Sequence, residues 1–575
     1  MNAMFSGVER WPDVMIPMRD GIRLAADVYL PPCSTPAPAL LLRTPYNKRL
    51  GEGEGYAHPS WYARHGFAVV CQDVRGTFQS EGELRPFHHE AKDGFDTIEW
   101  IAEQPWCDGQ VGMYGFSYPG ATQLLAATAS PPCLKAMAPA MTASDYYEGW
   151  TYHQGALQLA FVLGWAAGLG RRQAVRAGDS AALSAFDALL QAPASLYARL
   201  PLLDALPPEL ERHAPFLREW LRHPSYDEYW QRIAPKESYR NIRVPALHIA
   251  GWYDIFLEGT LENFTHLQRQ SEKDQFLIVG PWYHMPWGPT VGACDFGSEA
   301  HNIVDETQLR FFRRILLGQE AGQEPSVRLF VMGENQWHSF DHWPPPCDRR
   351  LVLHLHSDGR AASVSGTGEL RTSAPGHQPP DIWPSDPTHP VLSLGGRSGS
   401  LASRAPMGPA NQRGEESRND LQLYTSAALG QPVTVIGTPV ATLFTACDSP
   451  SSDLIVRLVD VHPDGTAINV SDGNARITSN GAHDIHKISI SMSPTAIRFA
   501  AGHRIRLHVC GTSFPALDRN PGTGTPAAEA RADELHAITQ AVFHDGDYPS
   551  RLTLPIVAEH QTTPIQMQGD TGTTP

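Results

Sequence analysis

The sequence predicts an α/β region followed by an all-β region, and three observations support this fold class. Apolar segments alternate with helical segments in residues 1–141 and again in 241–324, which is typical of a parallel sheet covered by helices on both faces. Residues 142–240 instead contain long helical segments rich in Ala, Leu, Trp and Tyr. From residue 325 onward, short alternating segments are separated by Gly, Pro, Asp and Ser, which indicates a β-sandwich.

These regions predict the domain organisation of a chain that, at 575 residues, is too long for a single hydrophobic core. Residues 1–141 and 241–324 would form the two parts of an α/β domain. Residues 142–240 would form a helical cap inserted over the carboxyl ends of the parallel strands. Residues 325–575 would form the β-sandwich domain.

The individual elements of the α/β region follow from turn signals and apolar spacing. Residues 14–31 predict a hairpin, because two short strands flank the turn sequence Arg-Asp-Gly at 19–21. The segment 93–104 predicts an amphipathic helix, since its apolar positions repeat at helical spacing. The other predicted strands are 37–43, 67–74, 136–139, 244–251 and 275–280. The other predicted helices are one that ends over 61–65, and 121–127, 259–269 and 305–317.

The cap and the sandwich are predicted from the same patterns. Cap helices are expected at 154–168, 180–190 and 208–222. The stretch 357–419 is rich in Ser, Gly, Pro and Arg, but Trp383 within it favours ordered sandwich loops over a disordered linker. The predicted sandwich strands are 327–332, 351–356, 433–444, 453–461, 487–493 and 504–509.

Composition argues against several classes of partner and location. The net charge of -16 and the pI near 5.8 disfavour binding to nucleic acid and to anionic membranes. The first 14 residues carry two acids and no long apolar stretch, so we expect no secretory signal, and no later stretch is long enough to span a bilayer. The eight cysteines are scattered without a Cys-x-x-Cys pair, which favours free thiols in the reducing cytoplasm over a disulfide or zinc framework.

The segment 111–120 carries the first candidate for catalysis. It reads as an apolar strand, a Gly-x-Ser turn that ends at Ser117, and the start of a helix. A serine on such a turn presents its hydroxyl above the sheet, and the backbone N–H of Tyr118 would lie at the helix N-terminus, where an oxyanion is stabilised. Pro119 stands where a small residue is usual, which is tolerated in a first helical turn. Such turns are common, so this motif alone does not establish a nucleophile.

Ser117, Asp254 and His284 each follow their own predicted strand, so they would meet at the carboxyl edge of the sheet. The order Ser…Asp…His is that of α/β-hydrolases, and the three side chains supply the nucleophile, carboxylate and imidazole that acyl transfer needs. Asp73 also stands at a strand end, but it precedes the serine. We interpret it as the partner of Arg75 in a structural salt bridge or loop clamp.

Several sequence blocks resemble the signature motifs of the CocE/NonD hydrolases, the bacterial cocaine esterase group related to X-Pro dipeptidyl-peptidases and α-amino-acid ester hydrolases. The resemblance extends from about residue 15 to about residue 555 and includes the C-terminal region. The blocks are Thr44-Pro45-Tyr46-Asn47-Lys48, Asp73-Val74-Arg75-Gly76-Thr77, Gly115-Phe116-Ser117-Tyr118, Gly251-Trp252-Tyr253-Asp254, Gly280-Pro281-Trp282-Tyr283-His284, Arg457-Leu458-Val459-Asp460-Val461 and Gly502-His503-Arg504-Ile505-Arg506-Leu507.

The resemblance implies an α/β-hydrolase domain with an inserted helical cap, followed by a jelly roll as the β-sandwich. It implies Ser117 as the nucleophile, His284 as the base and Asp254 as the residue that orients the base. It also implies an oxyanion hole made by the Tyr46 phenol and the Tyr118 backbone amide. A rigid tyrosine ring can place one O–H where negative charge develops.

The resemblance further implies an acyl pocket lined by Trp150, Trp165 and Phe256, although ordinary packing within the cap would also explain these aromatic residues. In the α-amino-acid ester hydrolases, acidic residues near the active site hold the ammonium group of the substrate. Here Asp254 is followed by three apolar residues, and the first acid is Glu258. This departure favours an uncharged acyl group that is bulky or apolar.

We therefore predict a serine carboxylesterase that cleaves carboxylic esters through an acyl-enzyme intermediate. Its expected partner is a small-molecule ester, and we expect neither a metal nor a cofactor. An amidase or X-Pro-type dipeptidyl peptidase, or an acyltransferase, would use the same triad and stays an alternative. Another alternative, from a different class, is a binding module whose jelly roll holds a carbohydrate or a partner protein. The sequence leaves open whether the chain forms a homodimer.

Overall fold

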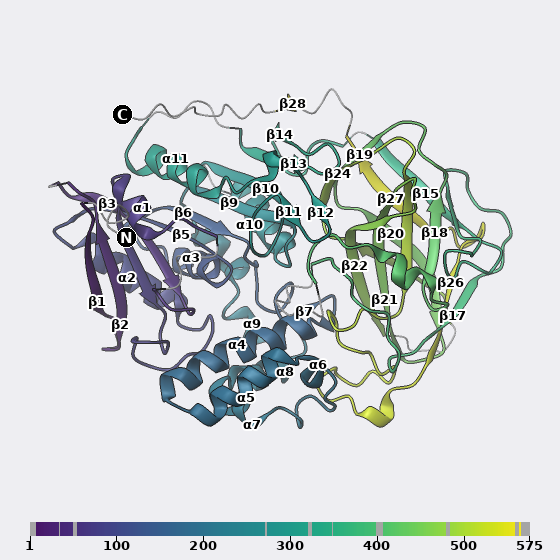
Figure 1. Ribbon diagram of the computed structural model, residues 1–575, viewed down its shortest axis with the longest axis horizontal. Coiled ribbons are helices and arrows are strands. Elements are labelled where there is room, and N and C mark those ends of the chain that lie inside the picture. The colour runs from purple at the N-terminus through teal and green to yellow at the C-terminus, as the bar shows by residue number, and fades with distance from the viewer. Residues whose placement is uncertain are drawn as a thin grey trace.

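The α/β region and the β-rich region lie side by side in the computed structural model, and a group of inserted helices lies below them (Figure 1). The predicted fold class, an α/β domain with inserted helices followed by a β-rich domain, is confirmed. No helix of the part of the chain described below is long and apolar enough to cross a membrane. The structure describes residues 7–33, 35–49, 55–270, 273–319, 325–347, 349–397, 406–478, 484–557 and 563–564.

One 11-stranded sheet forms the centre of the α/β region, in the order β1-β2-β4-β3-β5-β6-β9-β10-β13-β14-β28. The strands from β4 to β13 run parallel, whereas β1, β2, β14 and β28 pair antiparallel towards the two edges. The strands are β1 (Glu9–Pro17), β2 (Arg23–Leu30), β3 (Ala37–Thr44), β4 (Ala68–Asp73), β5 (Cys107–Phe116), β6 (Leu134–Ala140), β9 (Ala246–Tyr253), β10 (Gln275–Tyr283), β13 (Val327–Val331), β14 (Gln336–Phe340) and β28 (Thr563–Pro564).

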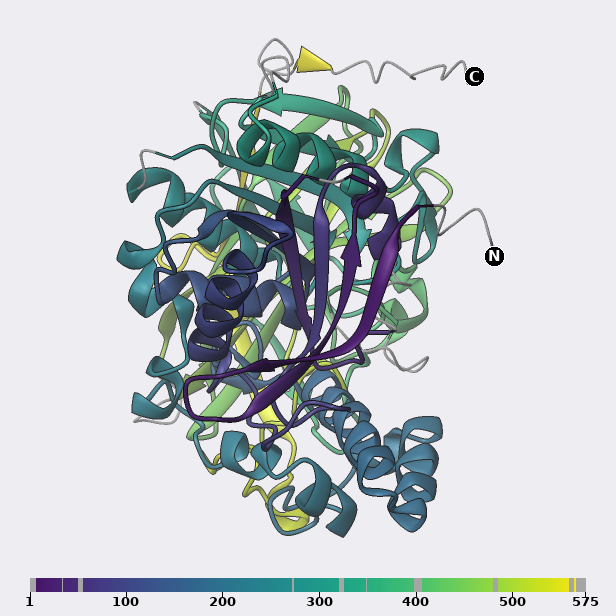
Figure 2. The same ribbon diagram turned by 90° about the vertical axis from the view of Figure 1, so that its left-hand side faces the viewer.

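Helices cover both faces of this sheet, and successive strand side chains therefore enter two different cores. Leu40 and Val69 belong to the core that contains α1 and α11, whereas Leu41 and Val70 belong to the core that contains α2 and α3. Figure 2 looks onto the edge formed by β1 and β2 and shows helices on either side of the sheet. The helices are α1 (Pro59–Arg64), α2 (Glu90–Ala102), α3 (Tyr118–Thr128), α10 (Leu257–Gln270) and α11 (Val304–Leu316).

The inserted helices differ from the prediction in two places. The residues predicted to start the first helix form the hairpin of β7 and β8, and α4 begins only at Leu159. The predicted helix 208–222 is two helices, because Pro215 has no N–H with which to continue the hydrogen-bond ladder of α7. The elements are β7 (Tyr152–His153), β8 (Ala156–Leu157), α4 (Leu159–Ala177), α5 (Ser180–Gln191), α6 (Ala194–Tyr197), α7 (Pro208–His213), α8 (Phe216–Leu221), α9 (Glu228–Gln231) and the 3-10 helix η1 (Pro235–Asn241).

Two strand predictions for the C-terminal region are wrong. The strand expected at 327–332 as part of the sandwich is β13, which pairs in parallel with β10 and extends the α/β sheet past residue 325. The strand expected at 433–444 is two strands, β19 and β20, with Pro439 between them, because proline cannot donate to a sheet ladder. The stretch 357–419 contributes the short strands β16 and β17, and its Trp383 is buried.

The β-rich region is a second sheet system of 13 strands. Its strands are β15 (Arg349–His356), β16 (Glu369–Arg371), β17 (Asp381–Ser385), β18 (Gln422–Ser426), β19 (Val433–Gly437), β20 (Val440–Cys447), β21 (Ser451–Val461), β22 (Ala467–Thr478), β23 (His486–Ser491), β24 (Thr495–Phe499), β25 (Arg504–Cys510), β26 (Ile538–Phe543) and β27 (Arg551–Ile556). A small hairpin of β11 (Thr290–Val291) and β12 (Cys294–Asp295) follows β10.

The strands β5, β9 and β10 end at the same edge of the α/β sheet, and β9 and β10 approach each other closely there. Gly251 in β9 allows this approach, since a Cβ atom on it would lie 2.3 Å from the carbonyl oxygen of Trp282 in β10. Asp254 follows the end of β9, and His284 follows the end of β10. The glycine therefore helps to set the separation of these two side chains.

The substitution Gly251→Ala should lower the free energy of unfolding by about 1–3 kcal/mol, because the added methyl group would overlap backbone that cannot move without separating β9 from β10. Urea unfolding followed by tryptophan fluorescence measures this change. Gly288→Ala is the matched control, since nothing lies within 4 Å of the Cβ atom it would add. Equal stability of the two variants would contradict the packing argument.

Candidate active site

Ser117 lies at a sharp turn between β5 and α3, with φ 63° and ψ -125°. Neighbouring glycines make room for this turn. A Cβ atom on Gly115, whose φ is 135°, would lie 2.5 Å from the Cβ of Pro119, and one on Gly120 would lie 2.8 Å from the carbonyl oxygen of Ala140. The serine N–H donates to that same carbonyl at 2.9 Å. The turn thus has the geometry of a nucleophile elbow, and Pro119 fits into its first helical turn.

The structure brings together the three residues that the strand-end argument selected. The Oγ of Ser117 lies 3.0 Å from Nε2 of His284, and Nδ1 of His284 lies 2.7 Å from Oδ1 of Asp254. All three residues are buried. When Nδ1–H donates to the carboxylate, Nε2 is the free acceptor for the serine proton, which is the arrangement required for general-base activation of a hydroxyl.

Aromatic residues fix and enclose the imidazole of His284. The rings of Phe116 and Phe256 lie 5.6 Å and 5.2 Å from it, centroid to centroid. The indole N–H of Trp287 donates to the backbone carbonyl of His284 at 3.0 Å. Sequence analysis did not select Phe116 or Trp287. Phe116 directly precedes Ser117, and Trp287 is three residues after His284, so their positions could have indicated a role at the site. Aromatic residues at such positions are equally typical of ordinary packing.

The rival carboxylate, Asp73, has a structural role, as we predicted, but its partner is Lys48 and not Arg75. It accepts a hydrogen bond from the backbone N–H of Lys48 at 2.6 Å and lies 3.6 Å from the Lys48 ammonium group. Arg75 pairs instead with Asp93 and Asp20. Burial raises the pKa of Asp73 to about 7, although Lys48 opposes the shift. The predicted Asp73–Arg75 pair is therefore wrong, and Asp73 clamps the loop that carries Tyr46.

Tyr46 reaches the nucleophile from the loop after β3. Burial raises the pKa of its phenol, and hydrogen bonds with Trp165 and Ser117 and the charge of Arg172 oppose the rise. The contact with Ser117 places the phenol beside the reacting oxygen. Tyr118 is the first residue of α3 and directly follows Ser117, so its N–H has no acceptor within the helix. Both groups that we predicted as oxyanion donors therefore belong to residues next to the serine, one in contact and one in sequence.

Trp165, which we predicted as a pocket residue, contacts Tyr46. Its indole N–H donates to the phenol oxygen of Tyr46 at 2.9 Å, and the guanidinium of Arg172 lies 5.4 Å from the centre of the Tyr46 ring. Both residues lie in α4. Because the phenol oxygen accepts from the indole, its own hydrogen is free to point towards the reaction centre. The cap therefore orients the phenol of Tyr46.

The side chain of Tyr118 is anchored below the nucleophile. Its hydroxyl donates to Oε1 of Glu90 at 2.8 Å and accepts from the N–H of Phe87 at 3.0 Å. Arg43 binds the other carboxylate oxygen of Glu90 at 2.7 Å. Burial raises the pKa of Glu90, whereas Arg43 lowers it. This buried network fixes the first turn of α3. The sequence did not predict it, because the spacing of these residues does not indicate that they are in contact.

The three predicted pocket residues lie against one another. Trp150 stacks on Phe256 with a centroid distance of 4.4 Å and meets Trp165 edge-on at 5.6 Å. Phe161 in α4 contacts both Trp150 and Phe256, and Trp220 in α8 stacks on Trp165. Since Phe256 also touches the imidazole of His284, this aromatic wall extends from the cap to the triad.

The similarity of this chain to known proteins extends over both its α/β region and its β-rich region. Two family descriptions match the chain: X-Pro dipeptidyl-peptidase (S15 family) over residues 20–286, and the X-Pro dipeptidyl-peptidase C-terminal non-catalytic domain over residues 319–553. The cocaine esterase of Rhodococcus sp. (strain MB1 Bresler) is 38% identical over 569 residues, which cover 95% of this chain and 98% of that protein.

Solved structures share the whole architecture. An aminopeptidase from the marine sediment archaeon Thaumarchaeota archaeon matches with a TM-score of 0.80 and 25% identity, over 96% of this chain and 97% of that chain. An α-amino-acid ester hydrolase labelled with selenomethionine matches with a TM-score of 0.79 and 24% identity, over 96% and 97% of the two chains. The latter likeness concerns the fold.

A fluorophosphonate should form one covalent adduct with the wild-type chain and none with Ser117→Ala, because only an oxygen activated by an imidazole attacks the reagent. Intact-mass spectrometry measures the adduct without any knowledge of the substrate. Ser144→Ala is the matched control and should keep the adduct, since the Ser144 hydroxyl bonds to Glu262 rather than to a histidine. An adduct that persists on Ser117→Ala would remove Ser117 from the site.

The Tyr46→Phe substitution should lower kcat by about 10²–10³-fold, the usual effect of removing one oxyanion donor. Trp165→Phe should lower kcat by roughly 10-fold, about the energy of one hydrogen bond. In the Tyr46→Phe background, Trp165→Phe should have no further effect on kcat, because it acts through the phenol.

Trp150→Phe is the matched control for this double-mutant cycle. No hydrogen-bond partner is present for its indole nitrogen among the described residues, so its effect should be the same in both backgrounds. Steady-state kinetics with a chromogenic ester gives kcat and KM separately. Additive effects of Tyr46→Phe and Trp165→Phe would show that the indole does not act through Tyr46.

Proposed function

The chain belongs to the CocE/NonD family and is a serine carboxylesterase-type hydrolase, and we propose that it acts on small-molecule esters with an uncharged acyl group that is bulky or apolar. The observation that carries this proposal concerns Glu258, the first acid after Asp254. Its carboxylate is bound by Arg397 and His153. The aromatic wall beside His284 is the second support.

Glu258 is paired with residues of the cap and of the β-rich region. Its Oε1 accepts from Arg397 at 2.9 Å and from Ser493 at 3.0 Å, and its Oε2 lies 3.1 Å from Nε2 of His153. Burial tends to raise the pKa of Glu258, but Arg397 and His153 outweigh burial and hold it well below its ordinary value. A carboxylate that is already paired in this way offers little attraction to a substrate ammonium group.

The aromatic wall favours an apolar acyl group because it presents apolar surface beside His284. Trp150 and Phe256 are buried, and Phe256 bridges the cap and the imidazole of His284. An acyl group held beside Ser117 would remove such apolar surface from water, and each buried CH₂ stabilises binding by about 0.8 kcal/mol. A charged acyl group placed there would lose its hydration without a partner charge.

The proposed reaction uses each polar group of the site once. The Ser117 oxygen attacks the ester carbonyl while its proton passes to Nε2 of His284, and Asp254 stabilises the imidazolium that forms. The Tyr46 O–H and the Tyr118 N–H hold the negative oxygen of the tetrahedral intermediate. The alcohol leaves with the proton from His284, and water then attacks the acyl-enzyme by the same steps.

Amide hydrolysis is the second candidate, because both matching family descriptions refer to X-Pro dipeptidyl-peptidases. An X-Pro dipeptidyl substrate has a free ammonium group, and the pairing of Glu258 argues against that class here. An acyltransferase would form the same acyl-enzyme and release it to an amine or alcohol instead of water.

We also propose a reducing, cytoplasmic location. The support is that all eight cysteines are unpaired in the structure, four of them buried. Structural disulfides are typical of oxidising compartments and rare in the cytosol.

Three matched substrates test the proposal: the 4-nitrophenyl esters of 3-phenylpropanoate and of phenylalanine, and the 4-nitroanilide of 3-phenylpropanoate. The esters differ only in the α-ammonium group, and the anilide replaces the ester by an amide. We expect kcat/KM for the phenylpropanoate ester to exceed that for the phenylalanine ester by at least about 10-fold, which corresponds to about 1.4 kcal/mol. A preference for the phenylalanine ester would contradict the acyl preference, and equal rates on the anilide would favour the amidase.

A further inference from the structure

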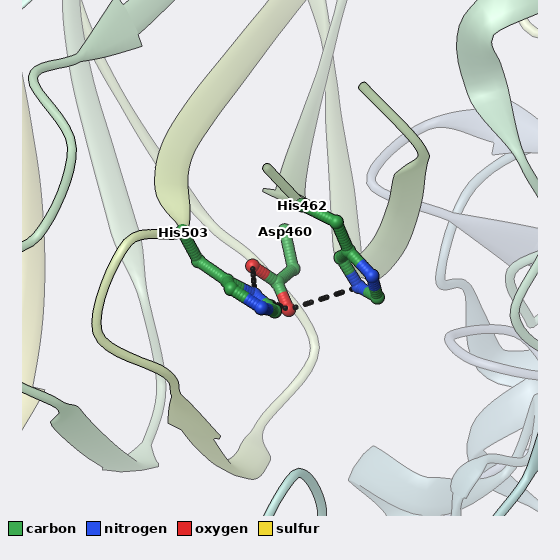
Figure 3. Close-up of side chains that lie close together, drawn as sticks. All are labelled: Asp460, His462 and His503. Atoms are coloured by element: carbon green, nitrogen blue, oxygen red, sulfur yellow. Dashed lines mark hydrogen bonds and ion pairs between the residues drawn. The ribbon is translucent and has the colours of Figure 1, made fainter. Parts of the chain in front are cut away.

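Three potential metal ligands meet at one end of the β-rich region, where β21 and β25 lie side by side. Asp460 is near the end of β21, His462 follows that strand, and His503 directly precedes β25 (Figure 3). The two strands are antiparallel, and Val461 pairs with Arg504. Continuing this register places His462 opposite His503, and Asp460 lies two residues from His462 on the same face. The alternation of strand side chains thus points all three towards one position.

The distances among the ligand atoms are close to those of a tetrahedral zinc site. Nδ1 of His503 lies 2.9 Å and 3.0 Å from the two carboxylate oxygens of Asp460, and Nε2 of His462 lies 3.5 Å from Oδ2 of Asp460. One atom from each residue lies within 4.8 Å of the other two. Metal–ligand bonds of about 2.0–2.1 Å at tetrahedral angles separate ligand atoms by about 3.3 Å. Small side-chain movements would therefore be enough to enclose an ion.

The charge of the cluster also favours a cation. Asp460 is 8% exposed, and in the described part of the chain its ion-pair partners are the two imidazoles and no Lys or Arg. Neutral imidazoles donate a hydrogen bond but supply no full positive charge. A buried carboxylate without a compensating cation is costly. A dication bound by all three side chains would supply that charge.

The backbone holds two of the ligands in place before any ion binds. His462 and Thr466 close a tight turn, in which His462 N–H donates to the Thr466 carbonyl at 2.8 Å. The carbonyl of His503 accepts from Leu429 N–H at 2.8 Å. The side chain of His462 remains partly exposed, so an ion could enter from solvent and retain a water molecule as its fourth ligand.

We propose that Asp460, His462 and His503 form a binding site for a divalent transition metal, with Zn²⁺ the best match. Two imidazoles and one carboxylate are ligands typical of zinc, whereas Mg²⁺ and Ca²⁺ prefer sets made of oxygen alone. The site is separate from the triad. A bound ion would join the end of β21 to the start of β25, which are paired strands of the β-rich region.

The competing explanation is a structural Asp–His pair that binds no metal. The number of metal ions bound per chain distinguishes this explanation from a metal site. The full chain is freed of metal with a chelator and titrated with Zn²⁺ by calorimetry and with Co²⁺ by visible absorption. We expect the wild-type chain to bind one more equivalent of either ion than the double variant His462→Gln/His503→Gln. Only the wild-type chain should show the absorption of tetrahedral Co²⁺ and a rise in Tm of several degrees on addition of Zn²⁺.

Two further variants keep the test decisive. His389→Gln is the matched control, because His389 is an exposed histidine that pairs with Asp386, and it should leave the metal count unchanged. Circular dichroism reports whether the double variant folds. If it does not, His462→Gln alone replaces it, since that side chain is partly exposed and its nitrogen lies 3.5 Å from Asp460. Equal Zn²⁺ and Co²⁺ stoichiometry in the wild-type chain and in these variants would overturn the proposal.

Discussion

The backbone at Ser117 is held at positive φ, a conformation that L-residues adopt only at a cost of about 1–3 kcal/mol, and the rest of the site is arranged around it. Gly115 and Gly120 leave the space that the turn needs, and the bond from Ser117 N–H to Ala140 ties the turn to the neighbouring strand. The same turn starts α3 and so leaves the Tyr118 N–H without a helical acceptor. One strained residue therefore fixes the positions of both the Ser117 hydroxyl and the Tyr118 N–H, the two groups to which we assign the attack and part of the oxyanion hole.

Features that depend on local pattern could be predicted from the sequence. The strand-end rule placed Ser117, Asp254 and His284 at one edge of the sheet, and the structure brings those side chains into hydrogen-bond contact. The hydrogen-bond partners around these three residues could not be predicted, because they come from distant parts of the chain. Trp165 and Tyr46, for example, are 119 residues apart. The wrong assignment of 327–332 has the same origin, because a short apolar strand does not indicate which of two sheets it joins. The Asp73–Arg75 error arose from treating sequence neighbours as partners.

The β-rich region does more than cover an end of the α/β domain. Arg397 and Ser493 reach Glu258 in α10, and Asn474 binds both the side chain and the backbone carbonyl of His153 in β7. These bonds join the cap, the helix after Asp254 and the β-rich region at one buried point. The pairing of Glu258, four residues after Asp254, therefore depends on all three regions, and Arg397 reaches it from 139 positions away in the sequence.

The indole of Trp165 connects the cap to the chemistry in a way that limits how such an enzyme can evolve. One face of its ring belongs to the aromatic wall, stacked with Trp220, while its N–H holds the phenol of Tyr46. Replacing this residue to admit a different substrate would also remove the hydrogen bond to Tyr46, the oxyanion donor in the mechanism that we propose. In that mechanism selectivity and turnover share one side chain, whereas substitutions elsewhere in the aromatic wall would leave the bond to Tyr46 in place.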